Sequence, residues 1–118
     1  MINNGIDIVQ ISRFDKLKNN NTFMHNIFND KELEYIKQRN NNSSTISGLY
    51  AAKEAFLKAI KKGINDYALK DIEISHNDNN APYIILHNEL DKLYNSNNIS
   101  LSISHDGDYC IAIASYLA

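Results

Sequence analysis

Three ionisable side chains stand at positions where an ordinary surface residue is not expected. Asp7 interrupts the β-branched segment Ile6–Ile11, Glu54 lies in an alanine-rich segment, and His105 ends an alternating apolar segment. Lys58 follows Glu54 by four residues, so the two would share one helix face. Two carboxylates can hold Mg²⁺, which completes its octahedron with water and substrate phosphates. Lys58 would face the same phosphates, and His105 could bind phosphate or act as a base.

Each of these residues also has an ordinary structural explanation. A solvated Glu54–Lys58 pair would stabilise a helix by roughly a few tenths of a kcal/mol. Asp7 could accept backbone N–H bonds at a strand end, and the segment around it favours neither explanation over the other. A lone histidine at a strand end, such as His105, is more often structural than catalytic. Spacing alone does not show that Asp7 and Glu54 meet. The chain has no glycine-rich phosphate loop and no nucleophile motif that would compete with this set of residues.

The segment from Ser47 to Gly63 predicts the helix that positions Glu54 and Lys58. It is rich in strong helix formers and has no glycine or proline between residues 49 and 62. Glycines bound it on both sides, so we expect about four turns, a serine or threonine of residues 43–45 as the N-cap, and Gly63 as the stop.

Small residues on this helix would let another backbone come close. Ala51, Ala55 and Ala59 recur every four residues. Residues 2–11 predict a strand buried on both faces. If that strand packs against the alanines, Asp7 could share a cation with Glu54.

The remaining patterns predict short elements around this helix. Asn29 and Glu32 form a capping-box pattern between two short helices. We expect helices near residues 22–28, 30–39 and 89–95, and strands near 72–75, 83–87, 99–104 and 109–115. This order predicts an α+β fold, with an antiparallel sheet packed with one long central helix and shorter helices.

Length and composition bound the class of protein. The 118 residues predict a single domain spanning residues 1–118. Twelve basic against fourteen acidic residues give a net charge of −2, which argues against a nucleic-acid-binding surface. Cys110 is the single cysteine, so an internal disulfide is excluded. We see no secretion signal and no apolar run long enough to cross a bilayer, and expect a cytoplasmic protein without a membrane segment.

Several segments resemble holo-[acyl-carrier-protein] synthases, the small bacterial 4′-phosphopantetheinyl transferases. These segments are GIDIVQISR (residues 5–13), FMHNIFNDKELE (23–34), AAKEAFLKA (51–59), Pro82-Tyr83, and LSISH (101–105) with Tyr109. They occur in this order over nearly the whole chain, and AAKEAFLKA resembles the family's most recognisable motif.

The resemblance implies a 4′-phosphopantetheinyl transferase-like fold and transfer of 4′-phosphopantetheine from coenzyme A to a serine of apo acyl carrier protein, in the service of fatty acid biosynthesis. Asp7 and Glu54 would be the Mg²⁺ ligands, Lys58 would contact the pyrophosphate or assist proton movement, and His105 would lie in the coenzyme A pocket. The other coenzyme A-binding residues would be Lys61, Lys62, Gly63 and Pro82. The proton acceptor stays open among a water on the metal, Glu54, Lys58 and His105. The nucleophile would belong to the carrier.

The resemblance also implies partners and one departure. Family members form homotrimers with active sites between subunits, and an acidic carrier docks on the first helical segment. Arg13, Lys16 and Lys18, a basic cluster that by itself suggests only a solvated face, would then steer the carrier. Leu49 stands where the family usually has arginine, so a phosphate contact is lost or supplied elsewhere, for instance by Lys61 or Lys62.

Two other functions are compatible with these residues. The first is a non-catalytic carrier-binding subunit of the same fold, which would have no need of Asp7, Glu54 and Lys58 together. The second is a Mg²⁺-dependent phosphohydrolase that would break down coenzyme A without a carrier.

Overall fold

The long helix α4 (Ser43–Ala59) lies at the centre of the molecule, between two antiparallel sheets. The structure, a computed structural model, describes residues 1–118. The strands are β1 (Ile2–Gln10), β2 (Ile72–His76), β3 (Pro82–Leu86), β4 (Ile99–Asp106) and β5 (Tyr109–Leu117). The helices are α1 (Phe14–Leu17), α2 (Asn21–Ile27), α3 (Asp30–Gln38), α4 (Ser43–Ala59) and α5 (Asn88–Leu93), with 3₁₀ turns η1 (Ile11–Arg13), η2 (Leu69–Asp71) and η3 (Ser96–Asn98). The α+β class with a long central helix is confirmed.

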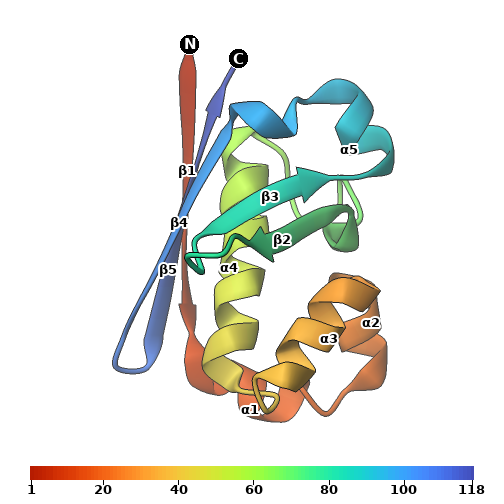
Figure 1. Cartoon of the computed structure of the whole chain (residues 1–118), viewed down its shortest axis with the longest axis vertical. Coiled ribbons are helices and arrows are strands. Elements are labelled where there is room, and N and C mark those ends of the chain that lie inside the picture. The colour runs from red at the N-terminus through yellow and green to blue at the C-terminus, as the bar shows by residue number, and fades with distance from the viewer.

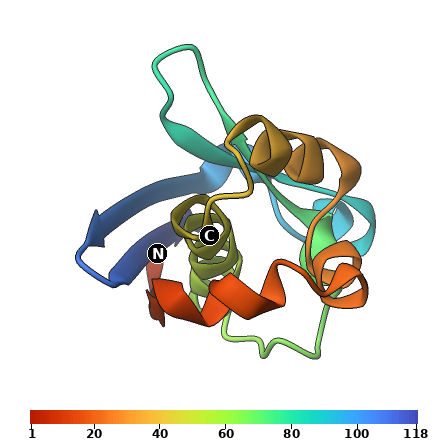
Figure 2. The same ribbon diagram turned by 90° about the horizontal axis from the view of Figure 1, so that it is seen from below.

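One sheet has the order β1-β5-β4, and the other is the β2–β3 hairpin. The three-stranded sheet covers one side of α4, the hairpin and helices α2 and α3 lie on the other side, and α1 lies below the lower end of α4 (Figure 1). Seen from below, α4 runs end-on through the middle of these elements (Figure 2). None of these helices combines the length and the apolar character that a bilayer-spanning helix needs.

Helix α4 begins and ends earlier in the chain than the sequence predicted. Its N-cap is Asn42, whose side chain accepts a hydrogen bond from the Ser44 N–H at 2.7 Å, so Gly48 lies inside the helix. The expectation that Gly63 is the stop was wrong. Ile60 is the C-cap, and Lys61 takes the left-handed conformation at φ 61°. The Lys62 N–H then donates a hydrogen bond to the Leu57 carbonyl at 2.8 Å, which satisfies one of the free carbonyls at the C-terminal end of the helix.

The alanine-lined face of α4 receives β1 at very short range. A Cβ atom on Gly5 would lie 2.0 Å from the Ala55 carbonyl oxygen and 2.5 Å from the Ala59 nitrogen. Both alanines are buried. Only a glycine on β1 and small residues on α4 allow the two backbones to come so close. The contact places Asp7, two residues further along β1, beside α4.

Strand β1 is buried on one face only, so the expectation of a strand buried on both faces was wrong for the single chain. Gly5, Asp7 and Val9 point toward α4, whereas Ile6 and Ile8 are 59% and 61% exposed. The outer face of the sheet continues across β5. We call this face the outer sheet face; its apolar members are Ile2, Ile6, Ile8, Tyr109, Ile111, Ile113 and Leu117.

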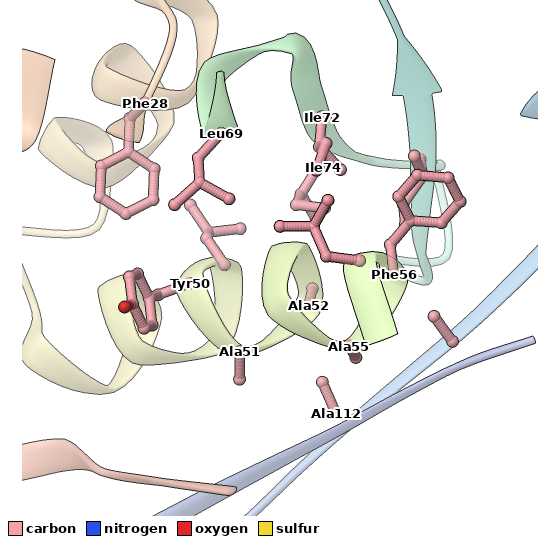
Figure 3. Close-up of a cluster of buried hydrophobic side chains, with 14 of the residues drawn as sticks. Phe28, Tyr50, Ala51, Ala52, Ala55, Phe56, Leu69, Ile72, Ile74 and Ala112 are labelled. Atoms are coloured by element: carbon pink, nitrogen blue, oxygen red, sulfur yellow. The ribbon is translucent and has the colours of Figure 1, made fainter. Parts of the chain in front are cut away.

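The other side of α4 contributes to the main apolar core. Figure 3 shows Phe28, Leu69, Ile72 and Ile74 facing Phe56 and the adjoining turns of α4. The hairpin, the short helices and the alternation of β4 agree with the sequence expectation. The capping box at Asn29 is also present.

A buried ion pair that the sequence analysis missed joins α3 to α4. Lys53 Nζ lies 2.7 Å from Glu32 Oε1, and both side chains are fully buried. The ammonium group also donates to the carbonyls of Leu69 and Ile72, at 3.0 and 2.8 Å, which uses all three of its donors. Glu32 accepts the Ile74 N–H at 2.8 Å. These bonds fix the rotation of α4 against its neighbours, and so the direction in which Glu54 points.

We predict that Gly5→Ala destabilises the fold by about 1–3 kcal/mol or more, because the new methyl group would overlap backbone atoms that cannot move independently. Chemical denaturation at fixed protein concentration measures this. Gly63→Ala is the matched control, since its Cβ would lie 3.5 Å from Asp66 Oδ2, an ordinary contact. Equal stability of the two variants would contradict the close approach of β1 and α4.

Candidate active site

Asp7, Glu54 and Lys58 come together where β1 crosses α4. Lys58 Nζ donates to Asp7 Oδ1 at 3.0 Å and to the Ile6 carbonyl at 3.1 Å. The side chain of Asp7 is 9% exposed and that of Lys58 55% exposed. Lys58 therefore pairs with the aspartate across the strand–helix contact, and it forms no ion pair within 4.0 Å with Glu54 on its own helix.

The two carboxylates are not fully neutralised by their surroundings. Asp7 Oδ2 is buried and has no hydrogen-bond partner. Burial raises the pKa of Glu54, and the negative charge of Asp7 raises it further, while Lys58 opposes both effects. Two carboxylates thus share one ammonium group at the edge of the core. A buried oxygen without a donor is costly unless a cation or another donor meets it.

This arrangement fits a divalent cation with hard oxygen ligands. Asp7 Oδ2 is available, and Glu54 supplies a second carboxylate close enough for the two charges to influence each other. No third histidine, cysteine or carboxylate joins them to form a larger metal-binding group. Such a donor set suits Mg²⁺, which keeps several water or substrate oxygens in its coordination sphere.

Tyr50 belongs to this site, although the sequence analysis did not single it out. Burial and the neighbouring Glu54 carboxylate raise the pKa of Tyr50 to about 12, so its phenol keeps its proton at neutral pH. Tyr50 precedes Glu54 by four residues, which places both on one helix face. That spacing was a signal by which the sequence could have identified it.

A small hollow adjoins the carboxylates at the C-terminal end of α4. It measures about 210 Å³ and is lined by Glu54, Leu57, Lys58, Lys62, Gly63 and Ile64. Three residues expected to bind coenzyme A, namely Lys58, Lys62 and Gly63, therefore border one space. Lys61 is exposed and does not line it.

A second and separate space lies at the N-terminal end of α4; we call it the α3–α4 cavity. It measures about 330 Å³, and its lining residues are Tyr35, Arg39, Ser44, Thr45, Gly48, Leu49, His76, Asn80, Pro82, Ile103 and His105. His105 and Pro82 are here, as is Leu49. A Cβ on Gly48 would lie 3.3 Å from His105 Nε2, so this glycine makes room for the imidazole.

The single chain does not bring His105 to the two carboxylates. The two spaces share no lining residue. Gly48 and Lys58 are ten residues apart on α4, which corresponds to about 15 Å along a helix axis. The expected residues therefore form two groups, one with Asp7, Glu54 and Lys58 and the other with His105 and Pro82.

The basic cluster lies next to the first group. Arg13 ends η1, Lys16 lies in α1, and Lys18 is the C-cap of α1. Arg13 Cζ is 6.0 Å from the centre of the Tyr50 ring. The cluster is thus joined through Tyr50 to the face of α4 that carries Glu54.

Comparison with known proteins gives a consistent result over almost the whole chain. The family model described as 4′-phosphopantetheinyl transferase superfamily matches residues 4–114. The holo-[acyl-carrier-protein] synthase of Caldicellulosiruptor saccharolyticus is 42% identical over 117 residues, covering 97% of this chain and 94% of that protein. The synthase of Clostridium botulinum is 43% identical over 113 residues, covering 93% and 92%.

Solved structures agree with the sequence comparisons. The Helicobacter pylori holo-[acyl-carrier-protein] synthase in complex with coenzyme A has a TM-score of 0.80 and 38% identity, with 97% of each chain covered. The synthase of Neisseria meningitidis has a TM-score of 0.88 and 29% identity over the full length of both chains.

We predict that Mg²⁺ raises the thermal unfolding temperature of this protein, since it would bind the folded state through Asp7 and Glu54. In Glu54→Gln this gain should largely vanish. In EDTA at neutral pH the variant should be at least as stable as the unmodified protein, because one of two neighbouring negative charges is gone. Differential scanning calorimetry measures both. Glu89→Gln, an exposed carboxylate on α5, is the control; equal Mg²⁺ stabilisation of both variants would contradict the site.

Proposed function

This chain belongs to the 4′-phosphopantetheinyl transferase superfamily, within the group of holo-[acyl-carrier-protein] synthases, and we propose that it transfers 4′-phosphopantetheine from coenzyme A to a serine of an apo acyl carrier protein. The serine Oγ forms a bond to the β-phosphorus of coenzyme A. The bond from that phosphorus to the adenosine 3′,5′-bisphosphate breaks, and the serine proton is released to a base. The products are holo carrier protein and the bisphosphate.

The observation that supports this proposal most is the unpartnered Oδ2 of Asp7 beside Glu54 and Lys58. In this proposal Asp7 and Glu54 hold Mg²⁺. When bound, the metal would neutralise charge on the pyrophosphate and make the bisphosphate a better leaving group. The protein itself needs to position the reactants and stabilise charge, because transfer of this type requires little covalent help.

Lys58 has a donor left for the substrate. Two of its three ammonium donors are occupied by Asp7 Oδ1 and the Ile6 carbonyl. The third can point to the pyrophosphate from the half-exposed end of the side chain. The bonds to β1 hold the ammonium group in place, so less side-chain entropy is lost when the substrate binds. Lys62, Gly63 and the neighbouring Lys61 would border the same substrate.

We propose that the complete site is shared between two copies of the chain in a homotrimer. The two groups of site residues are separated on α4, and the outer sheet face is apolar and uncovered in the single chain. Covering this face with another copy would remove Ile6 and Ile8 from water. It would also allow Glu54 and Lys58 of one copy to face His105 and Pro82 of the next.

The basic cluster would receive the carrier. Arg13 and Lys16 are exposed, and Arg13 lies beside Tyr50 at the edge of the Asp7–Glu54 site. An acidic carrier docked there would present its serine close to these carboxylates. We place the reaction in the cytoplasm, in the supply of holo carrier to fatty acid biosynthesis. The chain has a single free cysteine, Cys110, so its fold does not depend on a disulfide and needs no oxidising compartment.

A non-catalytic carrier-binding subunit remains the second candidate. It would explain the basic cluster and the fold. It gives no role to the incompletely neutralised carboxylates of buried Asp7 and half-buried Glu54, which are costly and which a binding protein would not need.

We predict that apo acyl carrier protein of fatty acid synthesis gains the mass of phosphopantetheine when incubated with this protein, coenzyme A and Mg²⁺. Glu54→Ala should reduce transfer by about 100-fold or more, since a metal ligand is lost, while folding and carrier binding persist. Mass spectrometry of the carrier measures both. Carrier binding without any transfer by the unmodified protein would favour the second candidate, and loss of coenzyme A without a carrier would indicate a phosphohydrolase.

We predict that inactive variants complement each other if sites are shared. Subunits with Glu54→Ala mixed and reassembled with subunits carrying His105→Ala should regain about a quarter of the unmodified activity, because random mixing leaves a quarter of the interfaces intact. Sedimentation should give a trimer. A monomer, or no recovery on mixing, would contradict the shared site.

We predict that replacing Arg13, Lys16 and Lys18 by glutamine slows carrier association about tenfold or more at low salt and weakens its salt dependence. Stopped-flow mixing measures the rate. The matched control replaces Lys31, Lys37 and Lys70, which are exposed elsewhere, and changes net charge equally. An equal effect of both triple variants would show general charge attraction rather than docking.

A further inference from the structure

Tyr50 directs its hydroxyl to the Glu54 carboxylate from one turn earlier on α4. Side chains of a helix lean toward its N-terminus, so the carboxylate of Glu54 is carried back over the turn that holds Tyr50. Burial is the main cause that raises the pKa of Glu54, and a hydrogen bond with Tyr50 is the largest effect that lowers it. After burial and the Glu54 charge, the same hydrogen bond contributes to the raised pKa of Tyr50. The phenol therefore donates, and the carboxylate accepts.

The ring of Tyr50 is fixed by its neighbours, which aims the hydroxyl. Only 6% of the residue is exposed. The ring centre lies 5.4 Å from that of Phe14 and 6.4 Å from that of Phe23. The guanidinium carbon of Arg13 lies 6.0 Å from the same ring centre. A buried tyrosine usually satisfies its O–H group, and Glu54 is the side chain that hydrogen-bonds to this one.

Each carboxylate of the site is held by a different donor. Lys58 donates to Asp7 Oδ1 and to the Ile6 carbonyl, and it forms no ion pair with Glu54. The negative charge of Asp7 opposes the approach of Glu54. The Tyr50 hydroxyl counteracts this repulsion, because it gives Glu54 a fixed donor on its own helix. A carboxylate has about four lone-pair sites on its two oxygens, so Glu54 keeps sites free for a cation.

We propose that Tyr50 is a positioning residue of the cation site, whose hydroxyl holds the Glu54 carboxylate beside Asp7 so that Mg²⁺ meets both ligands already in place. This inference rests on the proposed function, which assigns Mg²⁺ to Asp7 and Glu54. Removing a donor that orients a metal ligand typically weakens metal binding by about 10- to 100-fold. Tyr50 acts through Glu54, so it sets the affinity for Mg²⁺ rather than the rate of the transfer step.

The first test compares Tyr50→Phe, which keeps the ring and removes only the hydroxyl, with Tyr67→Phe. Tyr67 is the matched control, because it follows α4 in the chain and does not border the hollow next to Glu54. In calorimetric titration with Mg²⁺, the Kd of Tyr50→Phe should be about tenfold or more above that of the unmodified protein. The Mg²⁺ concentration for half-maximal transfer should rise likewise, with kcat at saturating Mg²⁺ largely retained. Tyr67→Phe should change neither. Unchanged Mg²⁺ affinity in Tyr50→Phe would overturn the proposal.

Thermal unfolding in EDTA separates this inference from the proposed function, since it needs neither metal nor activity. Tyr50→Phe should lower the unfolding temperature by about 3–6 °C, because one hydrogen bond to a charged group is lost. In a Glu54→Ala background the same change should have little effect, since the acceptor is already absent. Equal losses in both backgrounds would overturn this inference and leave the metal site intact. Absence of Mg²⁺ binding by the unmodified protein would overturn the metal site, and the role of Tyr50 with it.

Discussion

The contact between Gly5 of β1 and the alanine-lined face of α4 is the constraint on which the site depends. The backbones approach so closely that no Cβ fits at Gly5. This distance brings the carboxylate of Asp7 within reach of Lys58 and places it near Glu54. A larger side chain on either element would separate the strand from the helix. The two carboxylates would then be ordinary, solvated residues of different elements.

Helix α4 carries two adjacent charged residues, Lys53 and Glu54, whose surroundings differ. Lys53 is fully buried, and each of its donors has an acceptor. Such a pair adds little net stability, but removal of one partner is costly, so it fixes the packing of the helix. Glu54 faces the other way, toward Asp7, where negative charge exceeds positive charge. The satisfied pair fixes the packing of the helix, and the unsatisfied pair is where we propose that a cation binds.

The helix also separates the functional groups. Asp7, Glu54 and Lys58 lie at one end, and the α3–α4 cavity lies at the other, with His105 and Arg39. The outer sheet face is apolar without being covered by any element of the chain. Both features have one explanation if the chain works as an assembly, in which a neighbouring copy covers the sheet and supplies the missing part of each site.

The sequence by itself determined the element order and the α+β class, and it singled out Asp7, Glu54 and Lys58 as candidate site residues, because hydrophobic periodicity and side-chain chemistry are local properties. Only the tertiary structure showed that Lys58 pairs with Asp7 rather than Glu54, that Lys53 and Glu32 form a buried pair, and that Arg39 lines the cavity with His105. The sequence also did not show that Ile6 and Ile8 lie on an exposed face of the single chain. The apolar pattern of a β-branched strand is the same whether its second face packs against the core or against another chain. Contacts between residues distant in the sequence depend on how closely the backbones approach, and that distance is a property of the packed molecule.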